Sequence, residues 1–205
     1  MTEAEWEGCR DPLPMLAFVE GKASDRKGRL FSCGCCRHVW DRLLADWCRE
    51  AVEVNERLAD GQAEPHELHL IPPGAERSAG RITRLLTGWV FPRSLPREVA
   101  WETSRLGVRK KERLFQAALL RCLLGNPFRP APFDPAWRTP LVASLAESAY
   151  AERHLPSGEL DPQRLAVLAD ALEEAGAEGE LLAHLRSAGP HVRGCFGVDL
   201  ALGRE

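Results

Sequence analysis

Three cysteines and a histidine lie within six positions of the string LFSCGCCRHVW, residues 30–40. Thiolate and imidazole groups are the usual ligands of structural zinc. On an α-helix, which turns about 100° per residue, Cys33 and Cys36 share one face, whereas His38 points away from both. Cys35 falls on a second apolar flank of the same helix. The string therefore offers a pair of thiols for a metal, not a complete site.

A second pair of ligand types lies near the C-terminus, in the string HVRGC. His191 and Cys195 are four positions apart, a spacing that brings two side chains to the same face of a helix. Together with Cys33 and Cys36 they would complete a tetrahedral Cys₃His zinc site. Such a site would clip the second helix to the last and close a loop of roughly 150 residues, where a cross-link is most useful in principle.

The same cysteines have two other interpretations. Free cysteine is among the most buried residue types and behaves as a small hydrophobe, and these thiols lie on apolar helix faces. The sequence therefore favours plain core packing, with bound zinc or redox-sensitive thiols as alternatives. A thioredoxin-type redox pair is disfavoured because no βαβ pattern surrounds the motif.

Charge is distributed unevenly along the chain, whose net charge is −3. Residues 1–76 and 141–205 each carry −6, whereas residues 77–130 carry +9. Within this basic block the string RLGVRKKER supplies five cations near a helix start, where they could contact phosphates: Arg105, Arg109, Lys110, Lys111 and Arg113. No pattern of base-reading side chains accompanies them. A solvated helix start that neutralises acidic neighbours is the favoured interpretation, and nucleic-acid binding is the alternative.

Helix start and stop signals indicate the elements that position these residues. Asp11, Thr139 and Asp161 each precede a proline, the combination of an N-cap and a first helical residue, and glycines follow the expected helix ends. We expect helices over residues 11–21, 24–44, 46–61, 111–125, 139–155, 161–176, 178–189 and 190–203. No stretch alternates with period two, and GWVFP at residues 88–92 is the one strand candidate. The predicted fold class is all-α.

We expect one domain over residues 1–205, a multi-helix bundle with an irregular, proline-rich middle. Residues 62–108 are interpreted as a variable insert with one or two short helices. Residues 126–138 are interpreted as a proline-rich connector whose aromatic side chains, Phe128, Phe133 and Trp137, pin it to the core.

Two further features bear on location. No apolar run approaches the length of about 18 residues that a membrane helix needs, and the acidic start MTEAEWEGCRDP has no signal-peptide character. The sequence therefore predicts a cytoplasmic protein, without a membrane partner and with reduced cysteines.

Several segments together carry a family resemblance. The strings MTEAEW with DPLPML, SDRKGRLFSCGCCRHVW, GNPFRP, LAVLADALEEAG and HVRGCFGVDLALGRE resemble a family of small bacterial proteins of unknown function. That family occurs in many copies in some large, GC-rich genomes. The phrase LADALEEAG is also similar to part of a bacterial repeat-companion domain. Neither resemblance implies a reaction.

The motif inventory argues against an enzyme. The chain lacks the Walker A, GxGxxG, HExxH and GxSxG strings that carry common chemistries. We therefore expect a non-catalytic helical interaction or scaffold module whose charged blocks meet a protein partner, with a structural zinc or a buried thiol cluster. The alternative is a nucleic-acid-binding protein that uses residues 77–113.

Overall fold

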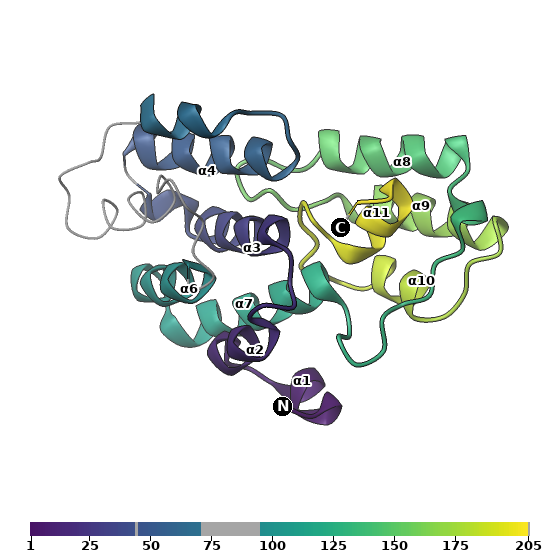
Figure 1. The fold of residues 1–205 in the computed structure, drawn as a ribbon, viewed down its shortest axis with the longest axis horizontal. Helices are drawn as coiled ribbons and strands as arrows, with labels where there is room; N and C mark the ends of the chain where they lie inside the picture. The colour runs from purple at the N-terminus through teal and green to yellow at the C-terminus, as the bar shows by residue number, and fades with distance from the viewer. Residues whose placement is uncertain (44, 71–94, 205) are drawn as a thin grey trace. The chain divides into compact units, whose positions relative to one another are not determined.

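The computed structural model describes residues 1–43, 45–70 and 95–204. These residues form ten α-helices and no β-strand (Figure 1). Two isolated bridges, from His154 to Glu159 and from Glu159 to Val192, are the extended pairings in this part of the chain. The predicted all-α fold class is confirmed. The strand candidate at residues 88–92 lies outside the described residues.

The helices gather into two compact units, Met1–Ala117 and Ala118–Glu205. The boundary falls within helix α7, Arg109–Leu124. The sequence predicted a single domain and did not indicate this division. Judged by length and hydropathy, none of the helices in the described ranges could cross a membrane.

The first unit is built around helix α3. It comprises α1 (Glu3–Gly8), α2 (Pro12–Val19), α3 (Asp25–His38), α4 (Asp46–Ala59), the 3-10 turns η1 (Trp40–Arg42) and η2 (Pro65–Leu70), α6 (Leu95–Leu106) and the first half of α7. Helix α3 packs against α4 and α6, and α2 packs against α6. Every residue of α3 from Leu30 to Arg37 is buried. The cysteine motif is therefore the centre of this unit.

The predicted helix over residues 24–44 is shorter than expected. It ends at His38 because Val39 leaves the helical region, at φ −110° and ψ 26°. The 3-10 turn η1 follows and sets the Arg37 guanidinium over the Trp40 ring, 4.8 Å from its centroid. The turn also directs the fully buried Leu43 into the core.

Polar contacts join α3 to α4 along their buried seam. The Arg37 guanidinium donates to both carboxylate oxygens of Glu56, Nε to Oε1 at 2.5 Å and Nη2 to Oε2 at 2.8 Å. Arg26 forms an ion pair with Asp60 at 2.8 Å. Because the Arg37 and Glu56 side chains are only 3% and 5% exposed, their bidentate pair fixes the register of the two helices from within the core.

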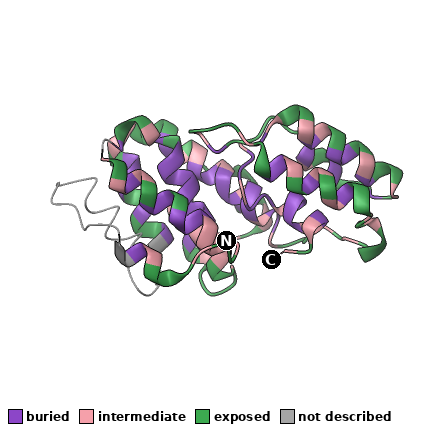
Figure 2. Cartoon of the chain, turned by 90° about the horizontal axis from the view of Figure 1, so that it is seen from above, coloured by how far each residue is buried: buried purple, intermediate pink, exposed green. Residues whose placement is uncertain are grey.

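The second unit packs helices around a core of leucine, alanine and valine. It comprises the second half of α7, the 3-10 turn η3 (Pro135–Trp137), α8 (Pro140–Ala151), α9 (Pro162–Glu174), α10 (Glu180–Leu185) and α11 (Phe196–Leu202). Helix α9 packs against α8 and α10, and α11 packs against both α8 and α10. In Figure 2 the buried residues follow one side of these helices and the exposed residues the other. Such two-sided helices bury one face against neighbours.

Capping residues begin the helices of this unit as the sequence predicted. The side chains of Thr139 and Asp161 accept hydrogen bonds from Val142 and Gln163 backbone amides, at 3.2 and 2.8 Å. In the connector, Phe133 and Trp137 meet edge to face at 5.6 Å and pack on the core. Phe128 is exposed, so two of the three connector aromatics pin the loop as expected.

Candidate metal centre

Four metal-ligating side chains converge in the second unit. Cys122 comes from α7, His184 from α10, and His191 and Cys195 from the segment between α10 and α11. One ligand atom from each lies within 4.8 Å of the ligand atoms of the other three. Cys122, His191 and Cys195 are buried, whereas His184 is half-buried. This group could hold a metal ion.

The segment that carries His191 and Cys195 is a turn, so the predicted helix over residues 190–203 is wrong in its first part. Helix α11 begins at Phe196, and Cys195 is its N-cap residue. The His191 carbonyl accepts a hydrogen bond from the Leu160 amide at 2.8 Å, which holds the chain extended. Gly194 has a φ of 91°, a left-handed conformation that glycine adopts without steric cost.

The hydroxyl of Tyr150 fixes this turn through two hydrogen bonds. Its hydroxyl donates to Asp199 Oδ1 at 2.8 Å and accepts from the Gly194 amide at 3.1 Å. Tyr150 and Asp199 are buried, at 4% and 1% exposure. A phenol from α8 therefore ties down both the turn before Cys195 and the first turn of α11.

The two imidazole rings are oriented by separate contacts. His191 Nε2 lies 3.1 Å from the Ser187 carbonyl oxygen, which can only accept, so this nitrogen carries a proton. Nδ1 of the same ring faces Cys195 Sγ at 3.9 Å. The His184 ring lies between the rings of His191 and Phe196, with centroid distances of 4.7 and 4.3 Å. Its Nε2 reaches Cys195 Sγ at 3.2 Å.

The electrostatics of the group favour a thiolate at Cys195. Burial opposes ionisation, but hydrogen bonds from Cys122, His184 and His191 together lower the pKa of the Cys195 thiol well below its usual range. For His191, burial acts to lower the pKa, but its contacts with Cys195 and Ser187 outweigh burial and raise the pKa. A thiolate is the form of cysteine that binds a metal.

The distances suit a tetrahedral ion. Bond lengths of about 2.3 Å to sulfur and about 2.0 Å to nitrogen place neighbouring S and N ligands of a tetrahedral zinc ion about 3.5 Å apart. The distances from Cys195 Sγ to His184 Nε2 and to His191 Nδ1, 3.2 and 3.9 Å, bracket this value. Two sulfur and two nitrogen donors are the ligand types found in tetrahedral structural zinc sites.

Half of the ligand set predicted from the sequence belongs to this group. His191 and Cys195 are members, whereas Cys33 and Cys36 are not. The latter two thiols lie in the core of the first unit, where Cys33 Sγ is 3.7 Å from the Val52 carbonyl oxygen. Burial raises the pKa of both thiols well above the usual range. They are therefore neutral side chains that fill space between α3 and α4.

The helical winding of the cysteine motif is as the sequence predicted. His38 is exposed and stacks on the Phe115 ring, with centroids 3.6 Å apart. Cys35 is buried, and its pKa is raised first by burial and then by Cys36 and Glu112. Glu112 belongs to α7, so Cys35 faces a different neighbour from Cys33. All seven cysteines lie in the described residues, and none of them forms a disulfide bond.

Sequence reasoning missed Cys122 and His184. Cys122 stands alone in the apolar string LLRCLLG and resembles an ordinary core residue. For His184 a signal was present, since His184, His191 and Cys195 fall within twelve residues. Three ligand types so close in the sequence are a stronger indication of a metal than a thiol pair inside a helix, where burial alone explains the cysteines.

The predicted nucleic-acid residues lie at the junction of α6 and α7. Arg105, Arg109, Lys110 and Lys111 are exposed. Arg113 instead forms an ion pair with the α2 N-cap residue Asp11, at 2.9 Å. Four of the five predicted cations therefore face solvent, and the fifth serves the packing of the first unit.

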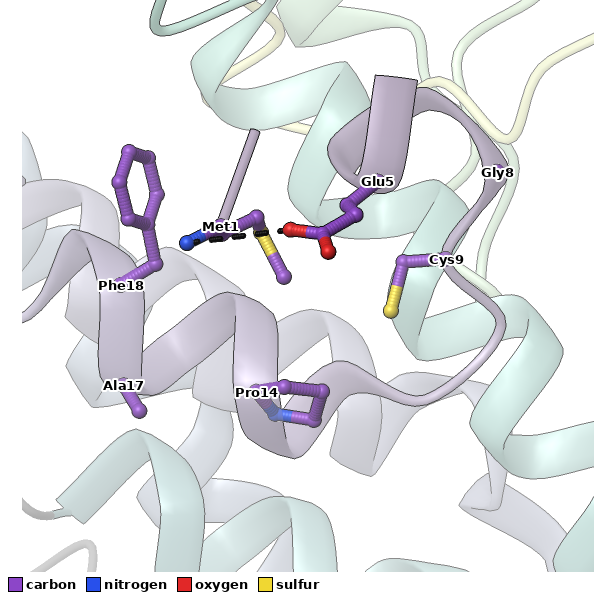
Figure 3. A pocket seen from close by; sticks show the side chains of 7 residues that line it. All are labelled: Met1, Glu5, Gly8, Cys9, Pro14, Ala17 and Phe18. Atoms are coloured by element: carbon purple, nitrogen blue, oxygen red, sulfur yellow. Dashed lines mark ion pairs between the residues drawn. The ribbon is translucent and has the colours of Figure 1, made fainter. Parts of the chain in front are cut away.

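An open pocket also lies beside α1 and α2. Figure 3 shows the ion pair between the Met1 amino group and Glu5, 3.9 Å apart, with Phe18 and Cys9 on the pocket wall. The Cys9 thiol donates to the Asp11 carbonyl at 3.1 Å. The lining is mostly apolar and carries no cluster of groups that would orient a substrate.

Comparison with known proteins does not extend these observations. No protein-family model matches the chain, and no curated protein or solved structure matches it either.

Proposed function

We propose that this protein is a non-catalytic, all-helical interaction or scaffold module whose second unit is held together by a structural zinc ion. The ligands would be Cys122, His184, His191 and Cys195. The single observation that carries the proposal is the convergence of two thiols and two imidazoles within 4.8 Å of one another. The sequence offered zinc at Cys33, Cys36, His191 and Cys195 as an alternative to core packing, and the proposal keeps the last two of these residues.

A structural role is favoured over a catalytic one by the number of ligands. Catalytic zinc usually has three protein ligands and keeps a fourth position for water or substrate. Here four side chains offer one ligand atom each, enough to fill a tetrahedral shell, and three of them are buried. The Ser187 carbonyl that fixes His191 is the kind of outer contact that orients a ligand ring and tunes its basicity.

The ion would tie together α7, α10 and the turn before α11. Cys122 and Cys195 are separated by roughly 70 residues, so their common metal would close a long loop and remove much of the freedom of the unfolded chain. Helices α10 and α11 are only six and seven residues long. Helices of this length are marginal in isolation, and a metal would compensate for their small buried area.

An interaction role is supported by the surface of the same unit. Leu141, Leu155 and Val167 are 58%, 65% and 51% exposed. Large apolar side chains in water supply contact points for a protein partner. We expect such a partner to bind the zinc-loaded form, because α10 and α11, which the metal would join, pack against the α8 and α9 helices that carry Leu141 and Val167.

Metal analysis of the purified protein tests the proposal. We expect one zinc per chain by mass spectrometry, and a tetrahedral visible spectrum with a sulfur-to-metal charge-transfer band after replacement by Co²⁺. Cys122→Ser and His184→Ala should lose the metal. Cys33→Ser with Cys36→Ser is the matched control and should retain it. Protein that binds no stoichiometric zinc or Co²⁺ when refolded with the metal would sink the proposal, and metal loss only in the control would move the site to the first unit.

A further inference from the structure

The junction of α6 and α7 carries an exposed tryptophan beside exposed cations. Trp101 is 42% exposed on α6. Arg105 follows it by four residues and therefore lies on the same face of the helix. From the start of α7, the Arg109 guanidinium approaches the Trp101 ring to 5.8 Å from its centroid. An indole with guanidinium groups beside it is a surface suited to a flat, anionic ligand.

At this junction two acidic side chains point inward, whereas the basic side chains point to solvent. Glu102 and Glu112 are turned inward, with exposures of 8% and 7%, and Glu112 lies 3.6 Å from His38 Nε2. Lys110 and Lys111 are exposed, and neither forms an ion pair with another residue in the described parts of the chain. Glu98 is exposed one turn before Trp101. The exposed side chains at this junction nevertheless carry a net positive charge.

Neighbouring basic residues on the same two helices are already used within the unit. Arg97 lies 3.9 Å from Glu20, and Arg113 pairs with Asp11. Arg105, Lys110 and Lys111 thus differ from them in having their charge directed to solvent. The Trp101 ring therefore has Arg105 and Arg109 beside it, and Lys110 and Lys111 add exposed positive charge at the start of α7.

We propose that the surface formed by Trp101, Arg105, Arg109, Lys110 and Lys111 binds single-stranded nucleic acid. A base stacks on the exposed indole next to Arg109, and the flanking phosphates contact Arg105, Lys110 and Lys111. Stacking on an aromatic ring is open to every base and needs a base face that is free, which a single strand offers and a duplex does not. The proposal concerns the first unit and is independent of the zinc site.

Two other anionic partners fit the surface less well. A bilayer requires a broad apolar face, and here the apolar side chains exposed beside the cations are Trp101, Val108 and Leu114. An acidic peptide would pair with the lysines but would leave the indole without a flat partner. Both are kept as outcomes of the test.

Fluorescence polarisation with a labelled 12-nucleotide oligothymidylate tests the proposal on the full-length protein. We expect binding at low salt with a log–log salt slope of about −2, the release of counterions from three phosphates of a single strand. Trp101→Ala should weaken binding about tenfold, the typical loss for one stacked base, and Trp101→Phe should restore most of it. Lys110→Gln with Lys111→Gln should reduce the size of the slope by about 1.4.

Controls separate the alternatives. Arg10→Gln with Arg42→Gln removes two exposed charges elsewhere in the first unit and should leave binding within twofold, and circular dichroism should show all variants folded. Cys122→Ser should bind normally, so that failure of the zinc proposal leaves this one standing. Equal binding to a duplex of the same length, equal loss in the Arg10 and Arg42 control, or preference for phosphatidylserine vesicles or polyglutamate would each overturn the proposal. No binding of the oligonucleotide at 20 mM salt would also overturn it.

Discussion

The Tyr150 hydroxyl donates a hydrogen bond of 2.8 Å to Asp199 Oδ1, and thereby joins α8 to α11 directly behind Cys195. Neither residue is a member of the Cys122, His184, His191 and Cys195 group. The hydrogen bond between Tyr150 and Asp199 affects the ligand group through the backbone before Cys195, because the same hydroxyl accepts a hydrogen bond from the Gly194 amide. The position of the Cys195 thiol therefore depends on a contact outside the ligand set.

Removing this hydroxyl should weaken both the fold and the metal centre. Tyr150→Phe keeps the ring but takes a buried partner from Asp199 and from the Gly194 amide. We expect a loss of about 1–3 kcal/mol in the free energy of unfolding and a tenfold or greater fall in zinc affinity. Urea denaturation and competition with a chromophoric chelator measure the two quantities. Unchanged affinity alongside reduced stability would show that the turn holds its shape without the phenol.

Stripping the metal should destabilise the second unit and leave the first largely unaffected. Zinc binding contributes directly to folding free energy when the ligands converge only in the folded state. In EDTA we expect residues 118–205 to exchange amide hydrogens faster, whereas α3 and α4 retain their protection. Hydrogen exchange followed by mass spectrometry resolves the two regions, and restored protection after addition of zinc is the matched control. Equal acceleration in both units would contradict the assignment.

Acidification should release the metal before it unfolds the chain. Protons compete for the imidazole nitrogens and thiolates that bind zinc, so the affinity falls as the pH falls. We expect zinc release, followed with a chromophoric indicator, to occur at a higher pH than the loss of helical circular dichroism. Replacement of His184 by cysteine should move the release to a different pH, whereas Cys33→Ser should not.

Thiol labelling should distinguish the cysteines by their surroundings. Burial raises the pKa of Cys33, Cys35 and Cys36, and a neutral, inaccessible thiol reacts slowly. Cys9 is half-buried and should be the first residue alkylated in the native, zinc-loaded protein. Mass spectrometry of the labelled peptides gives the order. Early modification of Cys33 or Cys36 would mean that the α3 core opens more readily than its burial implies.

The Arg37 and Glu56 pair gives a prediction for the first unit. Glu56→Gln removes the negative partner of a buried guanidinium and should cost about 3–5 kcal/mol in the free energy of unfolding. The double variant Arg37→Met with Glu56→Leu should be less destabilised, since it leaves no unpaired charge. Denaturant titration of Glu56→Gln and of the double variant gives the two free energies of unfolding to compare. A double variant as unstable as Glu56→Gln would argue that side-chain shape, not charge, determines the stability of the contact between α3 and α4.

Local signals predicted the fold better than the site. Asp11, Thr139 and Asp161 act as N-caps as their types and the following prolines indicated, because capping is decided within a few residues. His191 and Cys195 were chosen by assuming a helix, yet they meet across a turn. The approach of Cys122 depends on how α7 packs beside α10 and α11, and no local pattern contains that information.

The order of the ligands along the chain has a consequence for biosynthesis. Cys122 is made first, whereas His184, His191 and Cys195 follow close together much later. The three late ligands can capture an ion through local loop closure, which is fast, and Cys122 must then join them through a contact of high sequence separation. Ribosome-bound chains that end before residue 195 would thus contain α7, α8 and α9 without the metal. The second unit would complete its fold only after residue 195 has been added to the chain.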